Sequence, residues 1–384
     1  MDKSIISENL RRLRKFKKLS QTALAKGAGI SLSAYRNIEK EKSAPRIDTL
    51  MSISDILEVE LKQLLAPVNR LNAVRFRARK QMNSRPQILA DVGRWLSDFN
   101  QLEEILADKV DFKLAGFLYV LPPDYDMITA AAKCRGFLGL KPDEPIQDIC
   151  GLLESVGIKV YTYRLASHDF FGLSVAAKDG GPAIVVNTFE RIPVERWIFS
   201  AVHELAHLLF HLDSFDVEQS EENPEQEKEA DAFASHFLMP EEAFRKKWQE
   251  TSGLDSLERV LKVKRYFKVS YKTVLYRLTE LHGKEQQFFQ WFNTVYKQST
   301  GKSLAHYKEP ESQHPSAFSA SMAESFRSRE PEYLSNIEFI ESRLDRLVRL
   351  AIEKEEISLS RGAEILEYSL AEMRALANSW IAYA

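Results

Sequence analysis

The chain has 384 residues, 44% of them hydrophobic, and its 53 basic and 55 acidic side chains leave a net charge of -2. This length allows two or three domains, and the hydrophobic content is ordinary for a globular protein. No apolar run is long enough to span a membrane, the N-terminus lacks the layout of a signal peptide, and two cysteines (Cys134 and Cys150) cannot form a disulfide framework, so we expect a soluble, cytoplasmic protein.

Residues 1–66 predict a small helical domain. Their apolar residues recur at helical spacing and divide the segment into five short helices. Ser20 and Ser31 are expected to cap the second and third of these helices with their side-chain oxygens. Gly29, in the turn between them, is expected to adopt a positive φ that other residues resist.

The charge of this domain favours DNA as a partner. Residues 1–46 contain twelve Lys or Arg and four Asp or Glu, a local charge of +8 that is expected near phosphates. Gln21 would lie near the DNA backbone. The third predicted helix would present four side chains to the major groove, namely Ser31, Ser33, Ala34 and Arg36. The alternative is a basic helical bundle that binds no DNA.

The segment QTALAKGAGISLSAYRNIE, residues 21–39, carries a family resemblance. It closely resembles the Cro/CI-like (XRE) helix-turn-helix repressors, and the similarity extends over residues 5–66. The resemblance implies a DNA-binding transcriptional regulator. Because XRE-type domains usually bind as dimers, we expect a homodimer on a palindromic operator in double-stranded DNA.

Residues 67–124 predict a basic linker followed by connecting helices. Residues 69–87 contain six Arg or Lys, and no acidic residue occurs before Asp91. A solvated linker is the expected fate of such a charge run. A second phosphate-contacting arm and an exposed protease site are the alternatives.

Three apolar segments with Gly and Pro punctuation predict strands: GIKVYTYRL (157–165), FFGLSVAAK (170–178) and GPAIVVN (181–187). We expect them to form a small antiparallel sheet. His168 lies in the loop before the second strand. It could polarise the carbonyl of a substrate, or it could be an exposed loop histidine.

The segment FSAVHELAHLLFH, residues 199–211, has the spacing of a metal site. His203 and His207 lie one helical turn apart on one face, so both imidazoles can bind one ion. Glu204 could act as a general base on a water beside the metal. His211 lies about 12 Å from His203 along the axis, at about 1.5 Å per residue, which is too far for one ion with Zn–N bonds of about 2.1 Å. We expect His211 to lie behind the metal ligands or in the hydrophobic core.

A third ligand must come from another segment, because a catalytic zinc site has three protein ligands and one water position. In the predicted helix EKEADAFASHFLMP, residues 227–240, Glu227 and Asp231 share one face. Glu227 could bind the metal while Asp231 accepts a hydrogen bond from a ligand imidazole. Glu229 points elsewhere and is the weaker candidate. Two histidines and a carboxylate also suit manganese or iron.

The two segments RWIFSAVHELAHLLFH and EKEADAFASHFLMP together resemble the ImmA/IrrE family of zinc metallo-endopeptidases over residues 125–250. The resemblance implies that Glu204 is the catalytic base. It implies three ligands to Zn²⁺, namely His203, His207 and Glu227. Asp231 stands where the family often has Asn, which leaves its hydrogen-bonding role intact. In zinc peptidases a sheet edge beside the metal commonly aligns an extended substrate.

The C-terminal third predicts two helical modules that resemble helix-turn-helix units. The first, residues 251–300, has FKVS as its turn and Ser270 as a helix cap. Residues 301–384 begin with a polar linker rich in Ser and Pro and end in a second module, in which Ser360 and Ser369 are expected to open helices. Neither module has the basic surplus of residues 1–46, so we expect packing or sensing roles.

The chain is therefore predicted to be mainly α with a small antiparallel β-sheet, an α+β protein with a zincin-like central domain. We predict a DNA-binding regulator that is also a zinc endopeptidase. Its target would be a repressor, a partner protein or its own connector, cleaved in response to a stress or phage-type signal. The alternatives are a non-proteolytic transcription factor whose site is an occluded sensor, and an antitoxin-type autorepressor that binds a partner protein.

Overall fold

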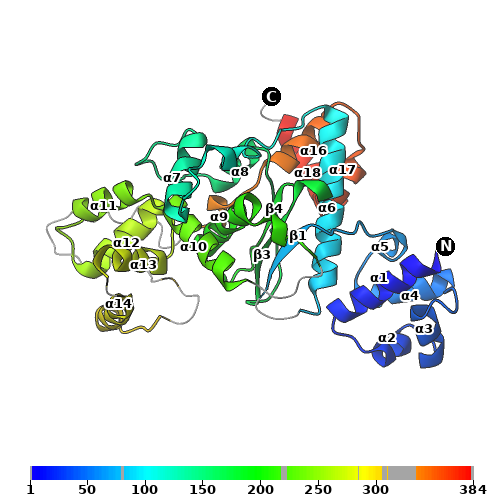
Figure 1. Ribbon diagram of the computed structural model, residues 1–384. Coiled ribbons are helices and arrows are strands. Elements are labelled where there is room, and N and C mark those ends of the chain that lie inside the picture. The colour runs from blue at the N-terminus through cyan, green and yellow to red at the C-terminus, as the bar shows by residue number, and fades with distance from the viewer. Residues whose placement is uncertain are drawn as a thin grey trace.

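The computed structural model describes residues 2–78, 82–217, 223–283, 285–304, 309 and 334–381. A four-stranded sheet lies at its centre with helices on both faces, and a separate helical unit lies at the N-terminal end (Figure 1). Among the described helices, none combines the length and the apolar character needed to cross a membrane.

The N-terminal unit contains the five predicted helices: α1 (Lys3–Phe16), α2 (Gln21–Gly27), α3 (Leu32–Glu39), α4 (Ile47–Leu57) and α5 (Leu61–Leu65). The predicted caps are confirmed, because Ser20 Oγ accepts from the Ala23 amide at 3.0 Å and Ser31 Oγ from the Ala34 amide at 3.1 Å. Gly29 has the predicted positive φ of 68°. The apolar side chains of these helices form a hydrophobic core of their own, so the unit is stabilised independently of the sheet.

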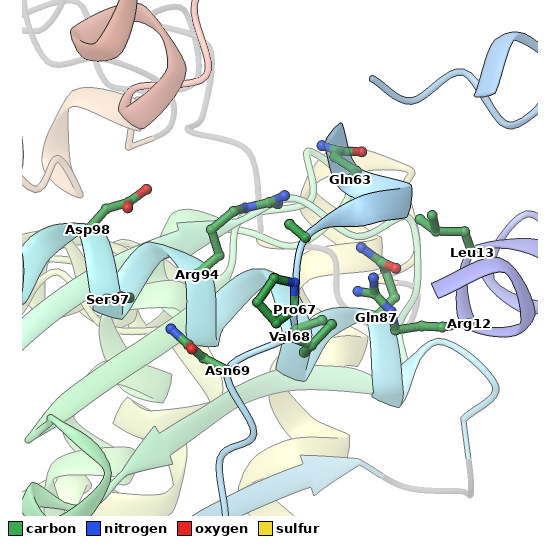
Figure 2. A pocket seen from close by; sticks show the side chains of 12 residues that line it. Arg12, Leu13, Gln63, Pro67, Val68, Asn69, Gln87, Arg94, Ser97 and Asp98 are labelled. Carbon is green, nitrogen blue, oxygen red and sulfur yellow. The ribbon is translucent and has the colours of Figure 1, made fainter. Parts of the chain in front are cut away.

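The junction between this unit and the rest of the chain is small. The Asn9 amide donates to the carbonyls of Leu64 and Ala66, which fixes the end of α5 on α1. Beyond it, α1 contacts α6 (Arg85–Leu106). A cavity of about 140 Å³ lies at this junction. Figure 2 shows that residues of α1, α5, α6 and the chain segment 66–69 line it. The two units therefore meet with a cavity between them.

The sheet has the strand order β1-β3-β4-β2, with β1 (Val74–Ala78), β2 (Lys159–Tyr163), β3 (Phe170–Val175) and β4 (Ala183–Asn187). The α+β class is confirmed. The sheet is mixed, however, because β2 pairs with β4 in parallel while β3 pairs antiparallel with both β1 and β4. The predicted sheet lacked β1 and the parallel pair, since local apolar patterns do not specify which strands become neighbours.

Both faces of the sheet are covered, which explains why β3 and β4 are buried along their whole length. One face packs on α9 (Val194–Phe210), with α7 (Met127–Phe137), α8 (Ile149–Ser155) and α10 (Pro224–Leu238) around it. The other face packs on α6, which is covered in turn by α16 (Arg343–Glu353), α17 (Leu359–Ile365) and α18 (Leu370–Ile381) (Figure 1). Two hydrophobic cores therefore lie on opposite sides of one sheet.

The remaining helices extend the core beside α10: α11 (Glu241–Glu250), α12 (Ser256–Phe267), α13 (Tyr271–His282) and α14 (Glu285–Thr300). Short 3-10 turns are η1 (Phe117–Val120), η2 (Ala177–Asp179), η3 (Leu212–Ser214) and η5 (Asn336–Glu338). Ser270 caps α13 as predicted. Ser358, instead of Ser360, caps α17, while Ser369 caps α18 as predicted. Most of the predicted Ser- and Pro-rich linker falls outside the described residues.

Candidate metal centre

Helix α9 carries the two histidines of the predicted metal site. It is apolar on almost every side because it lies between the sheet and α10, and His203, Glu204 and His207 have 0% of their surface exposed. Buried titratable groups at one-turn spacing need partners, since burying an unsatisfied polar group is costly. Helix α10 supplies partners for the two histidines.

Two imidazoles and one carboxylate converge between α9 and α10. The Nε2 atoms of His203 and His207 lie 2.9 Å apart. One oxygen of Glu227 lies 3.2 Å from His203 Nε2, and the other lies 3.3 Å from His207 Nε2. The potential ligand atoms of the three residues all lie within 4.8 Å of one another, so they could surround a single ion.

A second layer of hydrogen bonds orients the imidazoles. Asp231 Oδ1 lies 2.7 Å from His203 Nδ1, where the carboxylate accepts the ring proton and leaves the Nε2 lone pair facing the donor cluster. His211 Nδ1 lies 2.8 Å from His207 Nδ1, and the Nε2 atom of His211 lies 2.8 Å from Glu229 Oε2. As expected, His211 stands behind His207 and not among the converging donors.

Burial also sets the protonation of the site. Loss of solvent lowers the pKa of His207 to about 3, although Glu227 opposes the shift. Burial likewise lowers the pKa of His211. Both rings are therefore neutral near pH 7, and neutral imidazole is the form that binds a metal. The donor set of two imidazoles and one carboxylate fits zinc.

Strand β3 holds Glu204 beside this cluster. Ser174 Oγ donates to Glu204 Oε2 at 2.8 Å. A Cβ atom at Gly172 would lie 2.8 Å from the Val185 carbonyl and 3.4 Å from Glu204 Cγ, so only glycine lets the strand and the carboxylate approach this closely. Ser174 was not predicted as a site residue. The available signal was a single hydroxyl in an otherwise apolar strand.

Arg75 was likewise not predicted as a site residue. Its Nη2 lies 3.0 Å from Glu227 Oε1 and its Nη1 donates to Gln226 at 2.7 Å, with only 9% of the Arg75 side chain exposed. The expected solvated linker is thus wrong for residues 74–78, which form β1. The signal was the alternation of apolar and basic residues in VRFRA, which is the period of a half-buried strand.

The predicted DNA-contacting residues lie on α2 and at or near the start of α3. Ser31, Ser33 and Arg36 are exposed, and Gln21 and Ala34 are half-buried. Gln21 Oε1 accepts from Arg36 Nε at 3.3 Å, while its amide donates to Glu39 at 2.6 Å. The buried Glu39 also bonds Arg14 and the hydroxyl of Tyr35, which ties α3 to α1. The helix pair is thereby held as one rigid unit.

His168 lies in the loop before β3, as predicted. Its ring packs edge-on against Phe189, with the ring centroids 5.7 Å apart. It does not belong to the donor cluster found among the described residues. A role in polarising a carbonyl has no support from this contact.

Comparisons with known proteins match two parts of the chain. The family described as "Helix-turn-helix" matches residues 10–64, and the peptidase family described as "IrrE N-terminal-like domain" matches residues 153–279. The uncharacterized HTH-type transcriptional regulator YqaE of Bacillus subtilis (strain 168) is 37% identical over 86 residues, which are 22% of this chain and 74% of that protein.

A solved structure, the apo form of ComR from S. thermophilus, is 13% identical, and the match covers 77% of this chain and 93% of that one. Its TM-score of 0.16 is too low to carry an argument about the fold.

Proposed function

Since this chain belongs to the helix-turn-helix transcriptional regulators and carries an IrrE N-terminal-like domain, we propose that it joins DNA binding to zinc-dependent cleavage of a protein. The observation that carries the proposal is the convergence of His203, His207 and Glu227 beside a buried glutamate. We assign DNA binding to residues 1–66 and peptidase chemistry to residues 125–250.

The DNA-binding part would act as a homodimer on a palindromic operator. Helix α3 would enter the major groove, because its outward face carries Ser31, Ser33 and Arg36, with Ala34 beside them. Gln21 would contact the phosphate backbone and, through its bond to Arg36, would hold that guanidinium in place. The buried Glu39 network keeps α2 and α3 at a fixed angle.

The peptidase part would use the donor cluster for zinc. A bound zinc ion would supply Lewis acidity that makes a water nucleophilic near neutral pH and polarises a peptide carbonyl. Glu204 would take the proton of the attacking water and deliver it to the leaving amine. Ser174 would hold the Glu204 carboxylate in position through its 2.8 Å hydrogen bond. Asp231 and His211 would keep the two imidazoles aligned.

The substrate class that fits is a folded or flexible protein with an accessible extended segment. A partner repressor, another protein or the connector of this chain would qualify, with cleavage under a stress or phage-type signal. Proteolysis of a repressor would relieve repression, and this change would last until new repressor is synthesised.

A second candidate function rests on Arg75. Its guanidinium bonds Glu227, so a group from outside the matched peptidase region holds one of the predicted metal ligands. This contact favours a regulator that uses the metal domain as an occluded sensor, or as the binding site for a partner protein in the manner of an antitoxin.

One experiment separates these functions. We would purify the wild type, Glu204→Gln and His203→Ala, measure bound zinc by mass spectrometry, and incubate each protein with its own chain and with stressed-cell lysate. The peptidase proposal predicts zinc in the first two proteins and cleavage by the wild type alone. If the wild type and Glu204→Gln both bind zinc and neither cleaves a protein, the result would favour the function as an occluded sensor.

A further inference from the structure

Strand β1 comes from outside the region that matches the peptidase family. The match covers residues 153–279, which include β2, β3 and β4 together with α9 and α10. Within that region β3 and β2 are the two edge strands, and β1 adds to β3 from the connector that follows the DNA-binding unit. An outer strand offers unpaired amides and carbonyls to any extended chain.

The register places β1 across the candidate catalytic group. Arg75 is the antiparallel partner of Ser174, the residue that donates to Glu204. Residues directly opposite one another in an antiparallel pair project from the same face of the sheet, so Arg75 projects towards α9. Its guanidinium continues to Glu227 on α10. One residue of the connector therefore spans the space between the base and a predicted metal ligand.

The neighbouring side chains of β1 anchor it on the opposite face. Val74 is fully buried in the core beneath α6, and Phe76 stacks on Phe170 with centroids 5.1 Å apart. Asp179 accepts hydrogen bonds from the amides of Asn72 and Ala73 just before the strand. The register shifts between Arg77 and Ala78, where regular pairing ends. The strand is thus an extended peptide of the pattern apolar-basic-apolar, held by pairing and by one buried cation.

We infer that the outer edge of β3 is a peptide-binding site for an extended segment with a basic residue between two apolar ones, and that β1 is its internal occupant. This inference rests on the proposed function, because the consequence of an occupied β3 edge is that a substrate is kept away from Glu204. Only residues 66–73 link α5 to β1. A change at the loosely packed junction with the DNA-binding unit would therefore act directly on the strand.

Peptide binding tests the occupancy without requiring catalysis. The probe is a fluorescein-labelled synthetic copy of residues 70–80, RLNAVRFRARK, titrated into full-length, zinc-loaded protein with the Glu204→Gln change. In this background Arg75→Ala removes the cation on Glu227, and Arg245→Ala is the matched control, because Arg245 is exposed and pairs with Glu241 within α11. Arg75→Lys keeps the charge and should behave like the control.

The expected result is peptide binding at least about tenfold tighter to Arg75→Ala than to Arg245→Ala, since a hydrogen bond to a charged group contributes at least that factor. The amides of residues 171–175 should exchange hydrogen faster in Arg75→Ala, and the added peptide should restore their protection. Equal affinities together with equal exchange would overturn the inference and make β1 a permanent strand.

An engineered disulfide between β1 and β3 provides a second measurement, on a protein that retains Glu204. Val74 and Val175 are Cα partners, and opposite residues of an antiparallel pair lie within disulfide range. Val74→Cys with Val175→Cys should exclude the peptide when oxidised and admit it when reduced. Peptide admitted equally in both states would refute the occupancy. If the peptide enters only after reduction and is never cleaved, the occupancy stands and the peptidase proposal fails.

Discussion

Replacing Asp231 by alanine would remove the carboxylate that orients His203. The Asp231 oxygen lies 2.7 Å from His203 Nδ1, and it fixes both the tautomer and the rotation of the ring. Loss of such a partner typically weakens metal binding by about 10- to 100-fold, or roughly 1.4–2.7 kcal/mol. The Asp231 side chain is 52% exposed, so water can replace part of the lost bond, and we expect the lower end of this range.

His211→Ala provides the internal comparison. His211 stands behind His207 as Asp231 stands behind His203, but its side chain is only 4% exposed. Water replaces a buried partner poorly, so we expect the loss of zinc affinity to be larger than for Asp231→Ala. Asp231→Asn keeps an oxygen acceptor and should remain within about threefold of the wild type.

The assay is competition for zinc against a chromophoric chelator at constant pH, with circular dichroism to verify folding. An Asp231→Ala protein that is folded and binds zinc as tightly as the wild type would refute the assignment of the cluster as the metal site. A larger loss for Asp231→Ala than for His211→Ala would refute the role given to burial.

Three further predictions concern DNA binding and stability. Arg36→Ala should weaken binding to an operator selected from genomic DNA by about 1–3 kcal/mol in fluorescence anisotropy, and unchanged affinity would remove Arg36 from the interface. Glu103→Ala strands the buried cations of Lys159 and Arg343, at 3.1 Å and 2.6 Å, and should cost about 3–5 kcal/mol in urea denaturation, whereas a loss below about 1 kcal/mol would contradict the pairing. Burial raises the pKa of Glu154 to about 7, so the folded state favours the protonated acid, and stability should fall as pH rises from about 4.5 to about 7 by up to about 3 kcal/mol. Glu154→Gln should reduce the difference in unfolding free energy between pH 5 and pH 8, and an unchanged difference would contradict the shift.

Local features of the structure followed from the sequence. Ser20 and Ser31 cap their helices because capping depends on residues only three positions away. The facing histidines of α9 follow from the helical period alone. Glu227 was predicted as a metal ligand because the Glu-x-x-Ala-Asp pattern places two carboxylates on one face of the next long helix.

Features that depend on contacts between segments far apart in the chain could not be predicted from the sequence. The alternation in VRFRA fits a strand, yet it does not say that Arg75 meets Glu227, 152 positions later in the chain. The parallel pairing joins β2 to β4, two strands separated along the chain by β3, which pairs with the opposite side of β4. The cap of α17 was misplaced from Ser358 to Ser360 because both serines satisfy the local preference.

The central claim, that this regulator cleaves a protein by means of Glu204, is tested most directly by mapping new protein N-termini. Cells carrying the wild-type chain and cells carrying Glu204→Gln at equal levels would be compared by quantitative mass spectrometry of N-terminal peptides, before and after a stress. We predict at least one new N-terminus that depends on Glu204, with zinc bound to both proteins. Identical N-termini in the two strains, with zinc present in both, would contradict the claim.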